Sequence, residues 1–224
     1  GVAAETIGWQ PDDAPVVRLS DGLEGRCRPR VIVAHGEPPF HPVLRRLGAP
    51  LVAVLQNCYA WVEPADVERF RADLLKCDAC WAVSGSVKRY FEEHFRIPAE
   101  RIETIANPVR VPELGAGGGR RETRKSAGIP DEAPLLLFAG RWHPVKGIAQ
   151  LVRALARLRA LRGDIHLAIV GHVADPDYLH RVRKTVEEEG VGPAVHVVEW
   201  CSRVGDWYDA SDLFVMPSMI EGAS

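Results

Sequence analysis

Short apolar runs alternate with one-faced amphipathic segments along most of the chain. The runs with the length of strands are Arg30–Ala34, Leu51–Leu55, Ala79–Val83, Ile102–Ile105, Leu135–Ala139, Ile165–Val170, Val195–Val198 and Leu213–Met216. Most are continuously apolar, which is typical of parallel sheets covered on both faces. After Lys146, apolar residues recur at helical spacing from Ile148 to Leu161. The pattern predicts an α/β fold of right-handed β-α-β units in doubly wound parallel sheets.

The stretch between Pro112 and Pro134 interrupts this alternation. It is rich in glycine, and its charged cluster Arg120–Lys125 predicts one short helix that ends near Gly128. We therefore expect a linker with a short helix over 113–132, between a domain over 1–112 and a domain over 133–224. Both domains are expected to be incomplete, because no clear strand opens the first and the second stops just after a strand and a turn.

Composition narrows the class of protein. The chain has 224 residues, 46% of them hydrophobic, so it can bury a sizeable core. A net charge of −2 with interleaved signs predicts no partnership with nucleic acid. The five cysteines form no disulfide framework, which predicts a reducing, cytoplasmic location. No apolar segment approaches the roughly 18 residues of a membrane span, and a peripheral membrane contact stays open.

One loop combines two cations with two glycines. In Phe138–Gly147, FAGRWHPVKG, a strand leads through Gly140 and Arg141 to Lys146 and Gly147, where a long helix begins. Ligands bind at the carboxyl ends of parallel strands, and a helix N-terminus favours an anion. Arg141 can bind a phosphate with its forked guanidinium, and Lys146 adds a point charge. The loop predicts a phosphate site; the alternative is that both cations are ordinary surface residues.

The elements after this loop follow a recognisable order. A Val170-Gly171 strand end is followed by Ala210-Ser211-Asp212-Leu213, then Pro217-Ser218, then Glu221-Gly222. The combination resembles the donor-binding domain of the family 4, group 1 glycosyltransferases, which have the GT-B fold of two Rossmann-like domains. A passage of the first half is also similar, from Val83-Ser84 through Ile97-Pro98 to Asn107-Pro108-Val109. Pro108 stands where the family usually has glycine, so the turn must differ there.

The resemblance implies a retaining transfer of a sugar from a nucleotide-diphosphate sugar to an acceptor hydroxyl of a glycan, lipid or small molecule. Arg141 and Lys146 would hold the diphosphate leaving group, and Glu221 would approach the donor sugar. The remaining implied donor-binding residues are Gly140, Gly147, Gly171, Ser218 and Gly222. Neither a metal nor a cofactor is required beyond the donor. Two alternatives stay open: a nucleotide-sugar epimerase of the same fold, and a non-catalytic module that binds nucleotide sugars.

The family's second glutamate would lie beyond Ser224, so we expect a fragment, truncated at both ends and inactive by itself. In the first domain, the family often has a histidine after an early strand. Here that position is Gln56 or Asn57, and an amide can orient a hydroxyl without acting as a base. His35 also follows a strand and is a candidate for the cleft. In the second domain, His143 and His172 lie in candidate site loops; for all three histidines the alternative is an ordinary loop residue.

Three other motifs could be taken for functional sites, but each is better explained by a structural role. Cys77 and Cys80 have CxxC spacing without a second pair, which favours buried structural thiols over a metal or redox site. Asp175 and Asp177 match an Asp-x-Asp motif, but aspartate before proline at a helix start predicts an N-cap. The glycine-rich run 115–119 lacks a P-loop lysine and is interpreted as a flexible linker.

Overall fold

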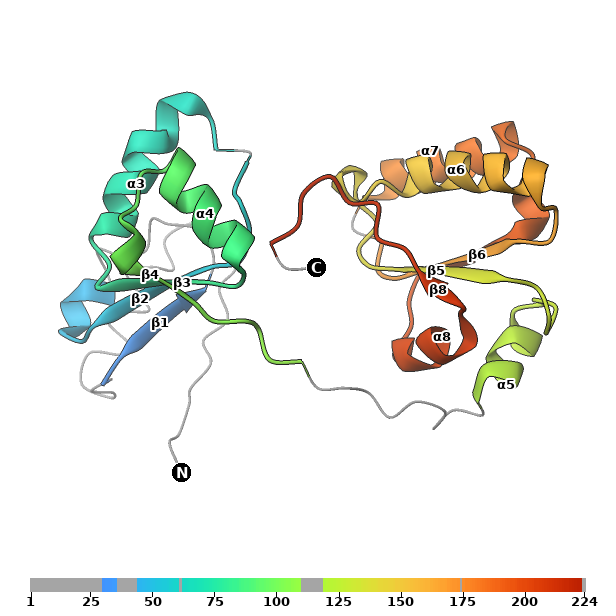
Figure 1. Cartoon of the computed structure of the whole chain (residues 1–224), viewed down its shortest axis with the longest axis horizontal. Helices are drawn as coiled ribbons and strands as arrows, with labels where there is room; N and C mark the ends of the chain where they lie inside the picture. Colours follow the sequence, from blue (N-terminus) through green and yellow to red (C-terminus); the bar gives the residue numbers. More distant parts are fainter. Residues whose placement is uncertain (1–29, 36–43, 61, 110–118, 174, 223–224) are drawn as a thin grey trace. The chain divides into compact units, whose positions relative to one another are not determined.

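The computed structural model describes residues 30–35, 44–60, 62–109, 119–173 and 175–222. The chain divides into two compact units. The first comprises Gly1–Pro108 together with Glu221–Ser224, and the second comprises Val109–Ile220. Each unit has its own parallel sheet and its own core (Figure 1).

The first unit is built on a four-stranded parallel sheet. Its strands follow the chain in the order β1 (Ile32–His35), β2 (Leu51–Leu55), β3 (Ala79–Ala82) and β4 (Ile102–Thr104). Helices α3 (Val67–Leu75) and α4 (Gly85–His94) lie on one face of this sheet (Figure 1). Short 3-10 turns connect the elements at Arg45–Leu47 (η1), Pro64–Asp66 (η2) and Ala99–Arg101 (η3).

The core of the first unit lies between this sheet and its two helices. Every residue of β2 is buried, as expected for a central strand with both faces covered. From the helices, Phe70 and Leu74 of α3 and Val87 and Phe91 of α4 pack into the same cluster. The Phe70 and Phe91 rings are tilted at 34° with centroids 6.5 Å apart, within the range of favourable aromatic pairs.

The second unit has a parallel sheet with a different strand order. The strands are β5 (Leu135–Ala139), β6 (His166–Val170), β7 (Val195–Val198) and β8 (Leu213–Phe214), and they lie in the order β7-β6-β5-β8. Helices α6 (Ile148–Leu161) and α7 (Pro176–Glu188) cover one face, and α5 (Gly119–Ser126) and α8 (Val204–Ala210) lie on the other (Figure 1). Two 3-10 turns, Pro144–Lys146 (η4) and Gly192–Ala194 (η5), complete the unit.

Alternating side chains of the strands supply the two cores of the second unit. Phe138 and Ile169 pack with α6 and α7, whereas Leu137 and Ala168 pack in the cluster that includes Trp207 of α8. All of these strand residues have at most 1% of their surface exposed. Burial on both faces is the reason the strands are continuously apolar in the sequence.

The structure confirms the predicted α/β class of two parallel sheets, and the strand bounds differ little from those predicted. The first strand runs over Ile32–His35 rather than from Arg30. The last strand, expected to reach Met216, ends at Phe214. Val215 still donates its N–H to the Leu137 carbonyl, but Pro217 has no N–H with which to continue the ladder.

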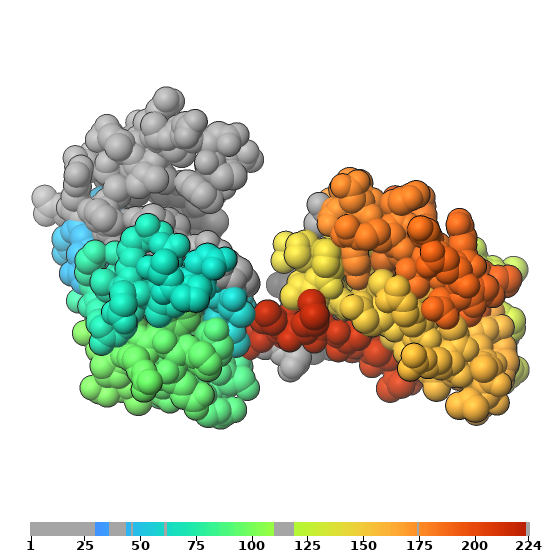
Figure 2. Space-filling view, turned by 90° about the horizontal axis from the view of Figure 1, so that it is seen from above, coloured from blue at the N-terminus to red at the C-terminus, as the bar shows by residue number. Residues whose placement is uncertain are grey.

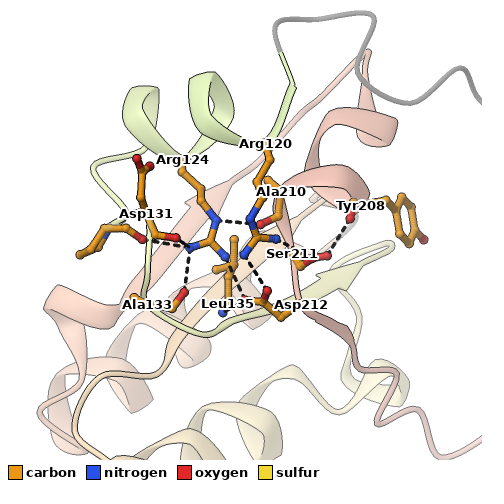
Figure 3. Close-up of polar contacts among 10 residues, drawn as sticks. Arg120, Arg124, Asp131, Ala133, Leu135, Tyr208, Ala210, Ser211 and Asp212 are labelled. Atoms are coloured by element: carbon orange, nitrogen blue, oxygen red, sulfur yellow. Dashed lines mark hydrogen bonds and ion pairs between the residues drawn. The ribbon is translucent and has the colours of Figure 1, made fainter.

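A fully buried arginine fastens α5 to the rest of the second unit (Figure 3). Arg124 donates to the carbonyl oxygens of Pro130, Asp131, Ala133 and Ala210 at 2.7–2.9 Å. Its remaining terminal nitrogen lies 2.9 Å from Asp212 Oδ2. A buried guanidinium is tolerated here because every side of its fork meets an acceptor.

Asp212 is the acidic partner in this network. It accepts hydrogen bonds from the Leu135 N–H at 2.8 Å and from Arg120 at 2.6 Å. Burial by itself would raise the pKa of Asp212, but the Leu135 N–H and the two guanidinium groups outweigh burial and lower it. The carboxylate joins the start of β5 to the start of β8, two neighbouring strands that are far apart in the sequence.

Candidate functional site

The strand order of the second unit marks one edge of its sheet as a binding position. From β5 the chain moves outward to β6 and β7, and then returns to place β8 on the other side of β5. Such a reversal opens a crevice outside the carboxyl ends of the two neighbouring strands. The loop Gly140–Gly147 follows β5 and the segment 215–218 follows β8, so both lie at this edge.

The loop and the segment after β8 are in direct contact. Met219 donates its N–H to the Val145 carbonyl at 2.9 Å. Gly147 has a φ of +68°, and a β-carbon on it would collide with the Pro217 carbonyl oxygen. The yellow atoms of the loop and the red atoms of the later segment adjoin in Figure 2. Gly147 is therefore required both for its left-handed backbone and for the close approach of Pro217.

A second pair of glycines brings the ends of β5 and β6 together. Gly171 has a φ of +146°, and a β-carbon on it would collide with the Gly140 carbonyl oxygen. Next to this contact, Trp142 donates its N–H to the His172 carbonyl at 2.9 Å. The Trp142 side chain is fully buried. The loop is thus anchored on both sides of Arg141, whose own side chain is exposed.

The anchored loop presents positive charge at this edge. Within the described part of the chain, Arg141 makes no hydrogen bond or ion pair. Lys146 is half-buried and immediately precedes Gly147, the N-cap of α6. No side chain caps this helix at its start, and its first turn holds no acidic residue. The positive end of the helix dipole therefore adds to the two side-chain charges.

Ser218, in the segment that follows β8, places a buried hydroxyl at the same edge of the sheet. The Ser218 Oγ is inaccessible to solvent and has no hydrogen-bond partner among the described residues. Buried polar groups are nearly always hydrogen-bonded, and one without a partner calls for an explanation such as a ligand or a water. The structure thus brings together Gly140, Arg141, Lys146, Gly147 and Ser218, with Gly171 supporting the loop.

The two histidines predicted near this loop contribute to its backbone. His143 accepts from the Val145 N–H at 3.4 Å through Nδ1 and caps the η4 turn. The His172 carbonyl accepts from Trp142, as described above. Both residues are exposed.

In the first unit, the predicted residues also gather at the carboxyl edge of a sheet. His35 ends β1 and Gln56 follows β2, and the Gln56 Nε2 lies 3.1 Å from the His35 Nδ1. The Gln56 Oε1 in turn accepts from the Asn107 Nδ2 at 3.0 Å. Asn57 has a different role, because its Oδ1 accepts from the Tyr59 N–H at 2.7 Å and shapes the turn after β2.

Glu221 and Gly222 belong to the first unit, whereas Arg141 and Lys146 belong to the second. Ser84 donates its hydroxyl to the Gly222 carbonyl at 2.5 Å. Gly222 is buried, and a β-carbon on it would collide with the Gln56 carbonyl oxygen. The glycine after Glu221 is therefore required for the close approach to the turn after β2.

Sequence reasoning did not select Ser84 or Asn107 as site residues. Each follows a strand of the first sheet, and that position could have identified both. Ser84 also caps α4 by accepting from the Val87 N–H at 3.2 Å. Its second contact, with Gly222, joins positions too distant in the sequence for any local pattern to indicate.

The N-cap predicted at Asp175 and the burial predicted for Cys77 and Cys80 are confirmed. Asp175 accepts from the Tyr178 N–H at 2.9 Å and caps α7, with Pro176 in the first turn. Cys77 and Cys80 are buried, and burial raises the pKa of the first to about 11 and of the second to about 12. The described residues contain no group of three or more metal-ligating side chains. Residues 115–118 lie outside the described residues.

No helix in the described ranges is long and apolar enough to cross a membrane.

Two family models match successive parts of the chain. The model of the glycosyl transferases group 1 matches residues 119–224, and that of Glycosyltransferase Family 4 matches residues 9–111. D-inositol 3-phosphate glycosyltransferase 1 of Catenulispora acidiphila is 32% identical, over 94% of this chain and 52% of that protein. Lipopolysaccharide 1,2-N-acetylglucosaminetransferase of Salmonella typhimurium is 30% identical, over 62% of this chain and 38% of that protein.

Solved structures share the fold at low sequence identity. Anabaena Alr3699/HepE in complex with UDP and glucose has a TM-score of 0.74 at 18% identity, covering 92% of this chain and 56% of that one. A glycosyltransferase from Rickettsia africae has a TM-score of 0.74 at 17% identity, covering 95% of this chain and 59% of that one. The chain spans about half the length of the Catenulispora acidiphila relative.

Proposed function

Because this chain belongs to the family 4, group 1 glycosyltransferases, we propose that it is part of an enzyme that transfers a sugar from a nucleotide-diphosphate sugar to an acceptor hydroxyl. The observation that carries the proposal is the exposed guanidinium of Arg141, which makes no ion pair or hydrogen bond within the described part of the chain. It lies on a loop anchored at the switch point of the second sheet.

Arg141 and Lys146 hold the diphosphate of the donor in this proposal. As the bond between the sugar and the diphosphate breaks, negative charge grows on the leaving group. Two fixed cations and the start of α6 stabilise that charge without having to reorganise. A role for Ser218 toward the donor rests on the family resemblance, because its Oγ is inaccessible to solvent in this structure.

The transfer is proposed to retain the configuration of the sugar. The acceptor oxygen forms its bond on the face from which the diphosphate leaves, and a phosphate oxygen of the leaving group takes the acceptor proton. This route needs no side chain to act as the base. A role for Glu221 toward the donor sugar rests on the family resemblance alone. Replacing Glu221 with glutamine should then lower kcat while leaving nucleotide affinity unchanged.

Relatives and neighbours suggest the first ligands to test. A neighbouring structure holds UDP and glucose, and relatives are named D-inositol 3-phosphate glycosyltransferases. We accordingly propose UDP as the first nucleotide to test and D-inositol 3-phosphate as the first acceptor. The expected cytoplasmic location, the lack of a required metal and the lack of a nucleic-acid partner stay predictions.

Calorimetry of UDP binding to the full-length protein tests the proposal. Charge-assisted hydrogen bonds contribute about 1.5–3 kcal/mol, so Arg141→Ala and Lys146→Ala should each weaken binding by roughly 10- to 100-fold. Arg157→Ala is the matched control, because Arg157 is an exposed arginine of α6 in the same unit. If Arg141→Ala bound UDP as tightly as Arg157→Ala, the assignment would be wrong.

A further inference from the structure

A chain of three polar side chains runs along the carboxyl edge of the first sheet. Asn107 Nδ2 donates to Gln56 Oε1 at 3.0 Å, and Gln56 Nε2 lies 3.1 Å from His35 Nδ1. Gln56 stands in the middle and uses both ends of its amide. The hydrogen bonds therefore run in one direction from donor to acceptor, and this direction decides which nitrogen of the neutral His35 imidazole carries the proton.

The direction follows from the orientation of the Asn107 amide and from what each atom can then do. In the structure the Asn107 amide turns its nitrogen toward Gln56, and because an amide nitrogen can only donate, the oxygen of the Gln56 amide faces it. The Gln56 nitrogen then faces His35 and also can only donate, so the His35 Nδ1 must accept. In a neutral imidazole with an accepting Nδ1, the proton is on Nε2.

We infer that Gln56 is a positioning residue, which holds His35 in the tautomer that presents an Nε2–H donor to an oxygen of the acceptor substrate. The inference rests on the proposed function for its ligand and on the hydrogen-bond chain for its geometry. Because Nε2 already carries a proton, neutral His35 binds an acceptor oxygen but cannot take the proton of an attacking hydroxyl. That role fits a transfer in which a phosphate oxygen of the donor is the base.

Two of the three side chains in this hydrogen-bond chain are carried by neighbouring paired strands or by the residue that follows one. His35 is the last residue of β1 and pairs in register with Val54, two residues before Gln56. Gln56 leaves β2, whose residues are all buried, and its carbonyl is packed against Gly222. Fixed backbones on neighbouring strands hold the two side chains at hydrogen-bond distance. His35 is exposed as a residue, which leaves its side chain open to a ligand.

Asn107→Asp should reverse the direction of the hydrogen-bond chain. A carboxylate only accepts, so the Gln56 amide must turn its nitrogen toward residue 107 and its oxygen toward His35. His35 must then carry its proton on Nδ1, which leaves Nε2 as a bare acceptor. Asn107→Ala is the matched control, because it removes the partner without imposing the opposite direction.

Nuclear magnetic resonance reads the tautomer directly and needs no substrate. Full-length protein with ¹⁵N-labelled histidine is studied at about pH 7.5, above the ordinary imidazole pKa of about 6.5. His35→Gln identifies the His35 signals among the eight histidines of the chain. The expected result is a protonated Nε2 in the wild type and a protonated Nδ1 in Asn107→Asp. A wild type protonated on Nδ1, or no change in Asn107→Asp, would overturn the inference.

Titration with ligands tests the acceptor part of the inference. D-inositol 3-phosphate should shift the His35 Nε2 signal in the wild type and shift it at least several-fold less in Asn107→Asp. Parallel titrations with myo-inositol and with inorganic phosphate show whether the hydroxyls or the phosphate of the ligand cause the shift. If none of the three probes shifts the signal, the acceptor role is wrong. Donor binding through Arg141 is measured separately with UDP, so this failure is distinguishable from failure of the proposed function.

Discussion

The carbonyl oxygen of Pro217 occupies the space that a β-carbon on Gly147 would need. Gly147 begins α6 directly after the cationic loop, and Pro217 follows the last strand of the second unit. Their approach fixes the loop against the segment that carries Ser218. The shape of the candidate phosphate site thus depends on the absence of a single side chain.

Gly147→Ala should reduce both stability and UDP affinity. Gly190→Ala is the control, because Gly190 has a similar φ of +66° but open space within 4 Å of the position that a β-carbon would take, whereas Gly147 meets Pro217. The control should lose about 1–2 kcal/mol from backbone strain. Gly147→Ala should lose a further 1–3 kcal/mol, roughly the cost of overpacking, in urea unfolding. Equal losses in the two variants would contradict the role of the Pro217 contact.

Arg124→Met should destabilise the second unit by about 3–5 kcal/mol, because it leaves buried acceptors without a donor. Arg120→Ala is the comparison, since Arg120 binds the same carboxylate from a side chain that is 41% exposed. Its loss should be at most about 1 kcal/mol. Chemical denaturation followed by circular dichroism measures both. Similar losses would show that burial of the Arg124 network is unimportant.

The stability of the second unit should fall on mild acidification. His166 Nδ1 and His196 Nε2 lie 2.9 Å apart on β6 and β7. Burial and then the charges of Arg159 and Arg124 lower the pKa of His166, against an opposing effect of Asp164. Burial and then His166 lower the pKa of His196, against a hydrogen bond with the Ala127 backbone.

Because both folded-state pKa values lie below the ordinary value of 6.5, the unfolded chain binds more protons in this window. Stability is therefore fully present above about pH 6.5 and declines as the pH falls toward the folded-state values. Urea unfolding at about pH 7.5 and about pH 5.5 measures the decline. The double variant His166→Gln with His196→Gln should reduce it, whereas His180→Gln, at an exposed position of α7, should not.

Alkylation by iodoacetamide should distinguish the cysteines of the native protein. The thiolate is the reactive form, and burial raises the pKa of Cys77 to about 11 and of Cys80 to about 12. Cys201 is half-buried and should react before Cys77 and Cys80 at about pH 8. Peptide mass spectrometry follows each site, and a denatured sample shows that all three can react. Labelling of Cys77 as fast as Cys201 in the folded protein would refute the structural interpretation.

Local patterns were enough to predict much of the fold. Leu51–Leu55, Leu135–Ala139 and Val195–Val198 have the bounds that were predicted, because continuous apolar runs reflect burial on both faces. The N-cap at Asp175 was predictable from local sequence too, since its hydrogen bond closes within three residues.

Contacts between distant segments could not be predicted in this way. The run Arg120–Lys125 has the sequence of a solvated helix, yet Arg124 is fully buried, because backbone carbonyls from two later segments surround it. Likewise, no local pattern indicates that Ser84 meets Gly222 or that Gln56 connects His35 with Asn107. The phosphate loop was predictable as a sequence, but its anchoring by Pro217 and His172 required the tertiary structure.

The Arg124 network also has a consequence for synthesis of the chain. The guanidinium can make its contacts with Pro130, Asp131 and Ala133 early, but those with Ala210 and Asp212 must wait until the segment around β8 has left the ribosome. Until then, the Arg124 guanidinium stays hydrated, because burying it without its full set of acceptors would be unfavourable. Helix α5 should therefore dock onto the second sheet only after β8 has been synthesised.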